Sequence, residues 1–249
     1  DGFAQTQVRV DVNPTSIDLE YVADDRGGFS IHGEAPGAYS GRSVHSVGDL
    51  DGDGYDEVAV AARNADMNAG RVYVIFGKYH NTSVQLNKLE EQEKGYVIYG
   101  ETAGDFAGTS IAGLGDVDGD GLGDLAIGAP KASPNGKSSG TTFVVRGKVT
   151  SDPVYLALVG TGDGGFAING EKISDFAGRS VAGAGDVNGD GLGDIVVGAY
   201  GADPGGSFSG AAYVVFGREA GKPTELAAIS AGMGGGFVIN GEASLDVAG

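Results

Sequence analysis

The chain has 249 residues, enough for one large domain or two small ones, and carries a formal net charge of −18. This acidity argues against nucleic acid as a partner, since phosphate binding needs a basic surface. The sequence has no apolar run of about 18 residues that would predict a membrane span, and the absence of cysteine excludes disulfides and thiolate metal sites.

The first elements are short β-type runs within residues 1–33, namely QVRVDV, SIDLEYV and GGFSIHGE. No basic-then-apolar leader precedes them, so we expect a secretion signal to be absent or already removed. Glycine accounts for 48 of the residues, far above the usual ~7%. Because the glycines fall at fixed places between apolar runs, they indicate tight turns rather than disorder.

The string GGFSIHGE recurs as GYVIYGE from Gly95, GGFAINGE from Gly164 and GGFVINGE from Gly235. Each copy is followed by a small-residue motif, AYSGRS at 38–43, DFAGTS at 105–110, DFAGRS at 175–180 and a partial DVAG at 246–249. An acidic loop and two further β-type runs then complete each full repeat. Self-similarity at a period of about 70 residues is the pattern of a repeat architecture.

Four short strands per repeat predict an all-β fold of four-stranded antiparallel propeller blades. Three full blades cannot close a ring, so we expect a fragment of a larger propeller. A β-sandwich is the competing fold, but it would not produce self-similar copies at constant spacing. The charged segment 87–95 is expected to be a loop, and the small residues of SIAGLGD and SVAGAGD are expected to line the inner strand. The predicted units are 1–33 (end of a preceding blade), 34–100, 101–170 and 171–241 (three full blades), and 242–249 (start of a further blade).

The acidic loops read DLDGDGYDE (49–57), DVDGDGLGD (116–124) and DVNGDGLGD (186–194). Alternate oxygen-bearing residues with a glycine at position 6 suit Ca²⁺, which takes six to eight oxygen ligands. We therefore predict three Ca²⁺ sites, with side chains at positions 1, 3, 5 and 9 and the backbone carbonyl at position 7 as ligands. The predicted ligands are Asp49, Asp51, Asp53, Tyr55, Glu57, Asp116, Asp118, Asp120, Leu122, Asp124, Asp186, Asn188, Asp190, Leu192 and Asp194.

Alternative kinds of site fit these loops less well. A helix-flanked EF-hand loop needs Glu at position 12, where this chain has Val60, Ile127 and Val197. Zinc would need His or Cys near the acids, and Mg²⁺ would make less use of so many protein oxygens. A solvated Asp/Gly turn would account for one such loop. It accounts poorly for three loops at equivalent positions of the repeats. Without an ion, the crowded carboxylates would repel one another.

The strings DFAGTSIAGLGDVDGDGLGDLAIGAP and DFAGRSVAGAGDVNGDGLGDIVVGAY resemble FG-GAP repeats, the blade unit of the integrin α-subunit β-propeller. The resemblance implies that the acidic loops bind Ca²⁺ on one rim and that partners dock on the opposite rim. It also implies seven blades, the missing ones coming from the same longer chain or from another chain. The first loop departs from the pattern, since Glu57 replaces the usual Asp, so we expect that site to be looser or shifted.

The predicted function is a calcium-binding, non-catalytic propeller module of a secreted or cell-surface protein that mediates adhesion or ligand binding. A protein or glycan ligand is expected on the rim opposite the calcium loops, at Tyr39, Arg42, Lys131, Arg179 and Tyr200. The alternative is an accessory or carbohydrate-binding propeller domain of a secreted hydrolase, phospholipase-like or glycan-active. No catalytic residue is predicted, because His32, His45 and His80 lie outside any recognisable serine or aspartate signature.

Overall fold

The computed structural model describes residues 29–77, 82–219 and 221–249. The larger of two compact units takes in nearly all of the described chain from Gly33 onwards. In the described part of the smaller unit, Val84 donates its backbone N–H to the carbonyl of Ser30 at 2.9 Å. There the short strands β1 (Ile31–His32) and β5 (Val84–Gln85) form a two-stranded sheet. The predicted end of a preceding blade within residues 1–28 lies outside the described residues.

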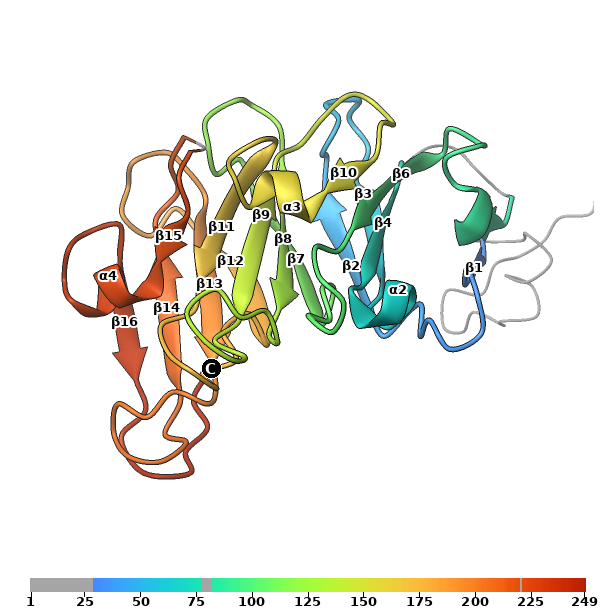
Figure 1. Cartoon of the computed structure of the whole chain (residues 1–249). Helices are drawn as coiled ribbons and strands as arrows, with labels where there is room; N and C mark the ends of the chain where they lie inside the picture. Colours follow the sequence, from blue (N-terminus) through green and yellow to red (C-terminus); the bar gives the residue numbers. More distant parts are fainter. Residues whose placement is uncertain (1–28, 78–81, 220) are drawn as a thin grey trace, which may run out of the picture. The chain divides into compact units, whose positions relative to one another are not determined.

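The larger unit is nearly all β, with three consecutive antiparallel sheets of the kind that form propeller blades (Figure 1). Within each sheet, the four main strands follow one another in chain order from the inner to the outer strand. These strands are β2 (Ser43–Gly48), β3 (Glu57–Ala62), β4 (Arg71–Ile75) and β6 (Gly95–Tyr99); β7 (Ser110–Gly115), β8 (Asp124–Ala129), β9 (Thr141–Val145) and β11 (Gly165–Asn169); and β12 (Ser180–Gly185), β13 (Asp194–Ala199), β14 (Ala211–Val215) and β16 (Gly236–Asn240).

A short fifth strand extends the first two sheets, and the sequence did not predict it. β10 (Val154–Tyr155) pairs in parallel with β6, and β15 (Thr224–Glu225) pairs in parallel with β11. Each of these strands comes from the connection that leads to the outer strand of the following sheet. The connection therefore ties the outer edges of successive sheets together.

Single helical turns follow the short strands β5, β10 and β15, just before the outer strand of each repeat (Figure 1). They are η1 (Leu86–Lys88), α3 (Leu156–Val159) and α4 (Leu226–Ser230), and each buries its leading leucine. The charged segment 87–95 therefore begins in a 3₁₀ turn and continues as turns up to β6. A fourth short element, α2 (Ala65–Asn68), is a tight turn with positive φ at Asp66 and Met67. Among the described residues, no helix is long and apolar enough to cross a membrane.

The hydrophobic core lies between neighbouring sheets, because alternate residues of a strand face opposite sides. On β8, Leu125 and Ile127 belong to the cluster shared with the first sheet, whereas Ala126 belongs to the cluster shared with the third. The outer strand of the third sheet leaves Phe237 and Ile239 exposed. A four-stranded sheet with two apolar faces is stabilised by a sheet on each side.

The inner strands β2, β7 and β12 run side by side, and small residues line the contact as predicted. A Cβ added to Gly113 of β7 would lie 2.5 Å from the carbonyl oxygen of Val47 on β2. A Cβ added to Gly183 of β12 would lie 2.9 Å from the carbonyl oxygen of Gly113. Backbone thus packs on backbone where the sheets converge.

We expect Gly113→Ala to separate the first two sheets, since the added methyl would meet rigid backbone rather than a movable side chain. Overpacking of this kind costs about 1–3 kcal/mol of unfolding free energy. Urea unfolding measures the loss. The control is Gly221→Ala, where an added Cβ meets nothing within 4 Å. Equal stability of the two variants would contradict the close approach of β2 and β7.

Candidate functional site

The acidic loops join the first and second strands of each sheet, at the same end of each. The inner strands β2, β7 and β12 pass into the loops through Gly48, Gly115 and Gly185, which have φ of 79°, 72° and 68°. The strand register shifts just before each of these glycines, as in a β-bulge. The three loops therefore begin with the same backbone conformation, although they lie far apart in the sequence.

The aspartate at position 1 organises the turn of each loop through both carboxylate oxygens. In the second loop, Asp116 Oδ1 accepts from the N–H of Gly119 at 2.7 Å, and Oδ2 accepts from that of Gly121 at 2.9 Å. Asp49 and Asp186 make the same two bonds in their own loops. The glycines at positions 4 and 6 have φ between 78° and 91°, which disfavours other residues. The calcium pattern predicted a required glycine at position 6 alone, although position 4 is also glycine in every copy.

The acid at position 9 is fully buried and holds the base of the loop. Asp124 accepts from Val117 N–H at 2.8 Å and from Gly147 N–H at 2.9 Å. Asp194 makes the equivalent bonds in the third loop. Burial raises the pKa of Asp124 to about 7, against the opposing effect of its two backbone donors.

Glu57 takes the same role in the first loop despite its extra methylene. It accepts from Leu50 N–H at 2.5 Å and from Gly77 N–H at 3.1 Å, and burial raises its pKa. The sequence predicted that Glu57 makes the first calcium site looser or shifted. That expectation concerns the bound ion and stays a prediction. The second donor was not predicted from the sequence, although it has a visible signal: a glycine after the third strand recurs in FGK, RGK and FGR as Gly77, Gly147 and Gly217.

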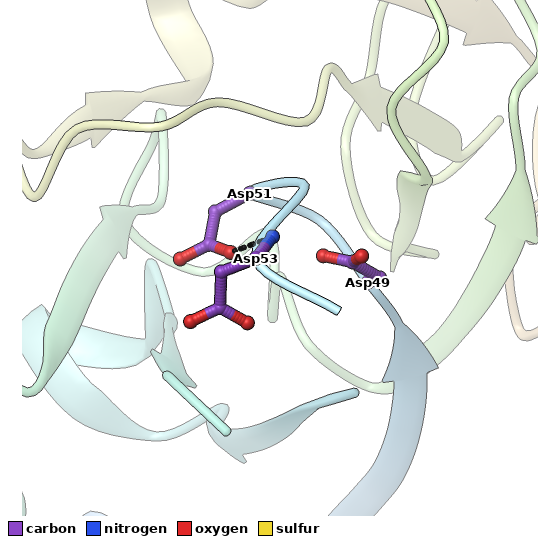
Figure 2. Close-up of side chains that lie close together, drawn as sticks. All are labelled: Asp49, Asp51 and Asp53. Atoms are coloured by element: carbon purple, nitrogen blue, oxygen red, sulfur yellow. Dashed lines mark hydrogen bonds between the residues drawn. The ribbon is translucent and has the colours of Figure 1, made fainter. Parts of the chain in front are cut away.

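Carboxylate oxygens converge in the first two loops. Oxygens of Asp49, Asp51 and Asp53 lie within 4.8 Å of one another, as Figure 2 shows for the three side chains on their shared loop. Oxygens of Asp116, Asp118 and Asp124 meet the same limit. The remaining predicted side-chain ligand of the second loop, Asp120, is exposed and accepts from Leu122 N–H at 2.8 Å.

The third loop has an amide at position 3. Asn188 Oδ1 accepts from Asp190 N–H at 2.9 Å, the same bond that Asp118 makes to Asp120 in the second loop. Asp190 in turn accepts from Leu192 N–H at 2.9 Å. The backbone amides at position 7 are thus bonded to position 5 in all three loops, Tyr55 included. The carbonyls at position 7 remain predicted ligands.

The donor set fits a hard divalent cation. Every converging side-chain atom is an oxygen, the donor type that Ca²⁺ prefers. Carboxylates held this close repel one another, and a bound cation would remove that repulsion. The backbone hydrogen bonds leave lone pairs on the same oxygens, so the loops can bond their own backbone and an ion together.

The loops also join each sheet to the next. The carbonyls of Asp49 and Leu50 accept from Gly123 and Lys148 of the second sheet at 3.1 and 2.8 Å. Asp116 and Val117 accept in the same way from Gly193 and Arg218 of the third sheet, both at 2.7 Å. The side chain at position 2 is buried in the first two loops, whereas Val187 in the third is 51% exposed. Ordering a loop therefore also orders a contact between sheets.

The predicted ligand-binding residues lie at the other end of the strands. Tyr39 and Arg42 precede β2 and are joined by a backbone hydrogen bond of 3.3 Å. The Lys131 ammonium lies 4.6 Å from the centroid of the Phe106 ring. Tyr200 stacks on Phe176, with centroids 5.2 Å apart.

Arg179 is exposed and shares Phe176 with Tyr200, since its N–H donates to the Phe176 carbonyl at 3.1 Å. Arg179 and Tyr200 thus both contact Phe176, Tyr39 and Arg42 lie in one turn before β2, and Lys131 contacts Phe106. The five residues are distributed over the three sheets.

The aromatic turns have left-handed backbone, with φ of 56° at Tyr39, 57° at Phe106 and 54° at Phe176. Phe106 and Ala107 donate to the carbonyls of Asn68 and Ala69 in the preceding sheet, at 2.8 and 3.0 Å. Phe176 and Ala177 donate in the same way to the carbonyls of Ser138 and Ser139, at 3.1 and 3.0 Å. The turns at Phe106 and Phe176 therefore join neighbouring sheets at the end opposite the acidic loops.

Comparison with known proteins matches the three repeats to one family. The FG-GAP repeat model matches residues 40–75, 107–145 and 177–215. The chain is 35% identical to integrin alpha-5 of Xenopus laevis over 188 residues, which is 72% of this chain and 16% of that protein. It is 32% identical to integrin alpha-IIb of Mus musculus, over 69% of this chain and 16% of that protein. Integrin alpha-PS2 of Drosophila melanogaster is also 32% identical, over 76% of this chain and 12% of its own length. The chain thus spans only a small part of these relatives.

Proposed function

Because the chain carries three FG-GAP repeats and is similar to integrin alpha subunits, we propose that it is a calcium-binding, non-catalytic β-propeller module that mediates adhesion or ligand binding. One observation carries the proposal: three loops far apart in sequence share the same backbone bonding and the same oxygen-rich pattern of side chains. The proposed sites are the loops 49–57, 116–124 and 186–194, each with one Ca²⁺.

The proposed role of the ions is structural. Each would neutralise a group of carboxylates that folding brings together, so its binding free energy would add to folding stability. Three Ca²⁺ would change the formal charge from −18 to −12. Because the carbonyls of the first two loops accept from the following sheet, these ions would also strengthen the contacts between sheets.

The proposed ligand surface is the end of the sheets opposite the acidic loops, which carries Tyr39, Arg42, Lys131, Arg179 and Tyr200. Four of the five are exposed and Tyr200 is partly so, and they combine aromatic and cationic groups, as protein interfaces often do. A protein or glycan ligand would bind there. The similarity to integrin alpha subunits supports a secreted or cell-surface location.

Further blades are the other proposed partners. The exposed Phe237 and Ile239 on the outer strand of the third sheet would pack against a following blade, from the same longer chain or from another chain. We assign the blades to residues 34–100, 101–170 and 171–241. Residues 1–33 would close a preceding blade, and 242–249 would begin the following one.

Cell attachment to surfaces coated with the chain tests the proposed function. We expect attachment in millimolar Ca²⁺, its loss in chelator, and a several-fold loss in the double variant Arg179→Ala/Tyr200→Ala. A matched control is Lys88→Gln, since Lys88 is an exposed residue of η1 outside both sets of loops. Attachment that is equal for all three proteins would contradict a role of this surface in adhesion.

A further inference from the structure

The second acidic loop has a cationic neighbour at the end of the third strand of its own sheet. Arg146 follows β9 in VVRGK, where the other repeats have phenylalanine, Phe76 in VIFGK and Phe216 in VVFGR. The backbone is the same in all three. Each residue donates its backbone N–H to the carbonyl of the residue that precedes the outer strand. The distances are 2.9, 3.0 and 3.0 Å for Phe76, Arg146 and Phe216. The difference therefore lies in the side chain.

The phenylalanines pack onto aromatic residues of the outer strand. Phe76 lies 6.0 Å from Tyr96, and Phe216 lies 6.2 Å from Phe237, measured between ring centroids. Arg146 instead reaches the acidic loop, where its Nε lies 2.5 Å from Asp118 Oδ2. The Nε makes no hydrogen bond, so the contact is an ion pair.

The pair lies among the converging carboxylates. The side chain of Asp118 is 3% exposed, and that of Arg146 is 39% exposed. The other oxygen of Asp118 accepts from Asp120 N–H at 3.2 Å. The guanidinium carries a permanent charge, because arginine stays protonated in proteins.

At the side-chain positions 1, 3, 5 and 9, the second loop has four acids, and the guanidinium of Arg146 offsets the charge of one of them. The third loop has three acids and Asn188 at the same positions. Asp118 stands at position 3, so its Oδ2 is an oxygen that an ion in the second loop would have to share with the guanidinium.

We propose that Arg146 is a built-in counter-cation of the second loop that competes with the divalent ion for Asp118. This inference rests on the proposed calcium binding and concerns the affinity of one of the three sites. The second loop then binds Ca²⁺ more weakly than its four acids would otherwise allow. It also depends less on the ion for its order, since part of the repulsion is already cancelled.

Calorimetric titration of Ca²⁺ into the metal-free chain tests the inference with Arg146→Phe, which installs the residue of the other two repeats. We expect the affinity of one site to rise roughly tenfold, from the Coulomb energy of a nearby unit charge in a solvent-like dielectric. Arg146→Lys keeps the charge and should stay near wild type, as should Lys88→Gln. Arg146→Gln serves in place of the phenylalanine variant if that variant does not fold.

Two further measurements locate and extend the effect. The gain in affinity should vanish when Asp120→Ala is added, because that change removes a ligand of the second loop. In chelator, Arg146→Phe should melt at a lower temperature than wild type, since the carboxylates lose their internal cation. Three ions bound with affinities that Arg146→Phe leaves unchanged would overturn the inference while the proposed calcium binding stands. A wild-type chain that binds no Ca²⁺ would overturn both.

Discussion

Removal of divalent cations is expected to lower the melting temperature of the chain by roughly 15–30 °C. A ligand that binds only the folded state adds about 2.7 kcal/mol at a concentration of one hundred times its Kd, and the chain offers three proposed sites. A domain of this size shifts by about 2–4 °C for each kcal/mol. Thermal unfolding followed by circular dichroism, in millimolar Ca²⁺ and in EDTA, measures the difference.

Magnesium provides the control for this melting experiment. Mg²⁺ requires near-ideal octahedral geometry and keeps several of its waters, so it makes less use of a loop rich in protein oxygens. After chelation, excess Ca²⁺ should restore the higher melting temperature, and Mg²⁺ should restore little of it. A melting temperature that does not respond to chelator would contradict a structural role for the ions.

The second large effect is expected at Asp124, and it should appear even in chelator. Asp124→Ala leaves the buried N–H groups of Val117 and Gly147 without their acceptor. Each unsatisfied buried group costs about 1–3 kcal/mol, so we expect a loss of roughly 2–6 kcal/mol in unfolding free energy. Urea unfolding in EDTA measures it directly.

Asp120→Ala is the matched control for Asp124→Ala. Both remove a carboxylate from the same loop, but Asp120 is exposed and its bond to Leu122 N–H is easily replaced by water. In EDTA we expect little loss for Asp120→Ala, whereas both variants should lose the second Ca²⁺. Equal destabilisation of the two variants in EDTA would show that position 9 does not hold the loop base.

The raised pKa of Asp124 makes the stability of the metal-free chain depend on pH. Burial raises the pKa from 3.8 to about 7, so the protonated form is favoured by folding. The contribution of Asp124 is complete below the lower value and is lost as the pH rises through the higher one. Urea unfolding in EDTA at a series of pH values should show wild type losing stability across this window, and Asp124→Asn losing less of it.

The sequence predicts the local elements of this fold well, because their signals are local. Apolar runs such as that of β8 alternate between two buried faces, and the glycines of the acidic loops mark turns with positive φ. The small residue Gly113 also predicts a close approach of inner strands, which the structure confirms. Because the same pattern occurs in three repeats, these strands and turns are predicted more firmly than one repeat alone would allow.

The contacts between repeats could not be predicted, since they depend on how one sheet is placed against the next. The parallel pairing of β10 with β6 joins strands from different repeats, and no period within either strand specifies it. The same holds for the bond from Lys148 to the Leu50 carbonyl. The ion pair of Arg146 had a visible signal, a charged residue where two other copies have phenylalanine. Its partner Asp118 became evident only from the fold.

Counting the calcium ions bound by the metal-free chain is the most direct test of the three proposed sites. Isothermal calorimetry should find three Ca²⁺ per chain, and Asp49→Ala, Asp116→Ala and Asp186→Ala should each remove one. A chain that binds no Ca²⁺ at millimolar concentration, or that keeps all three ions in these variants, would contradict the assignment of the acidic loops as calcium sites.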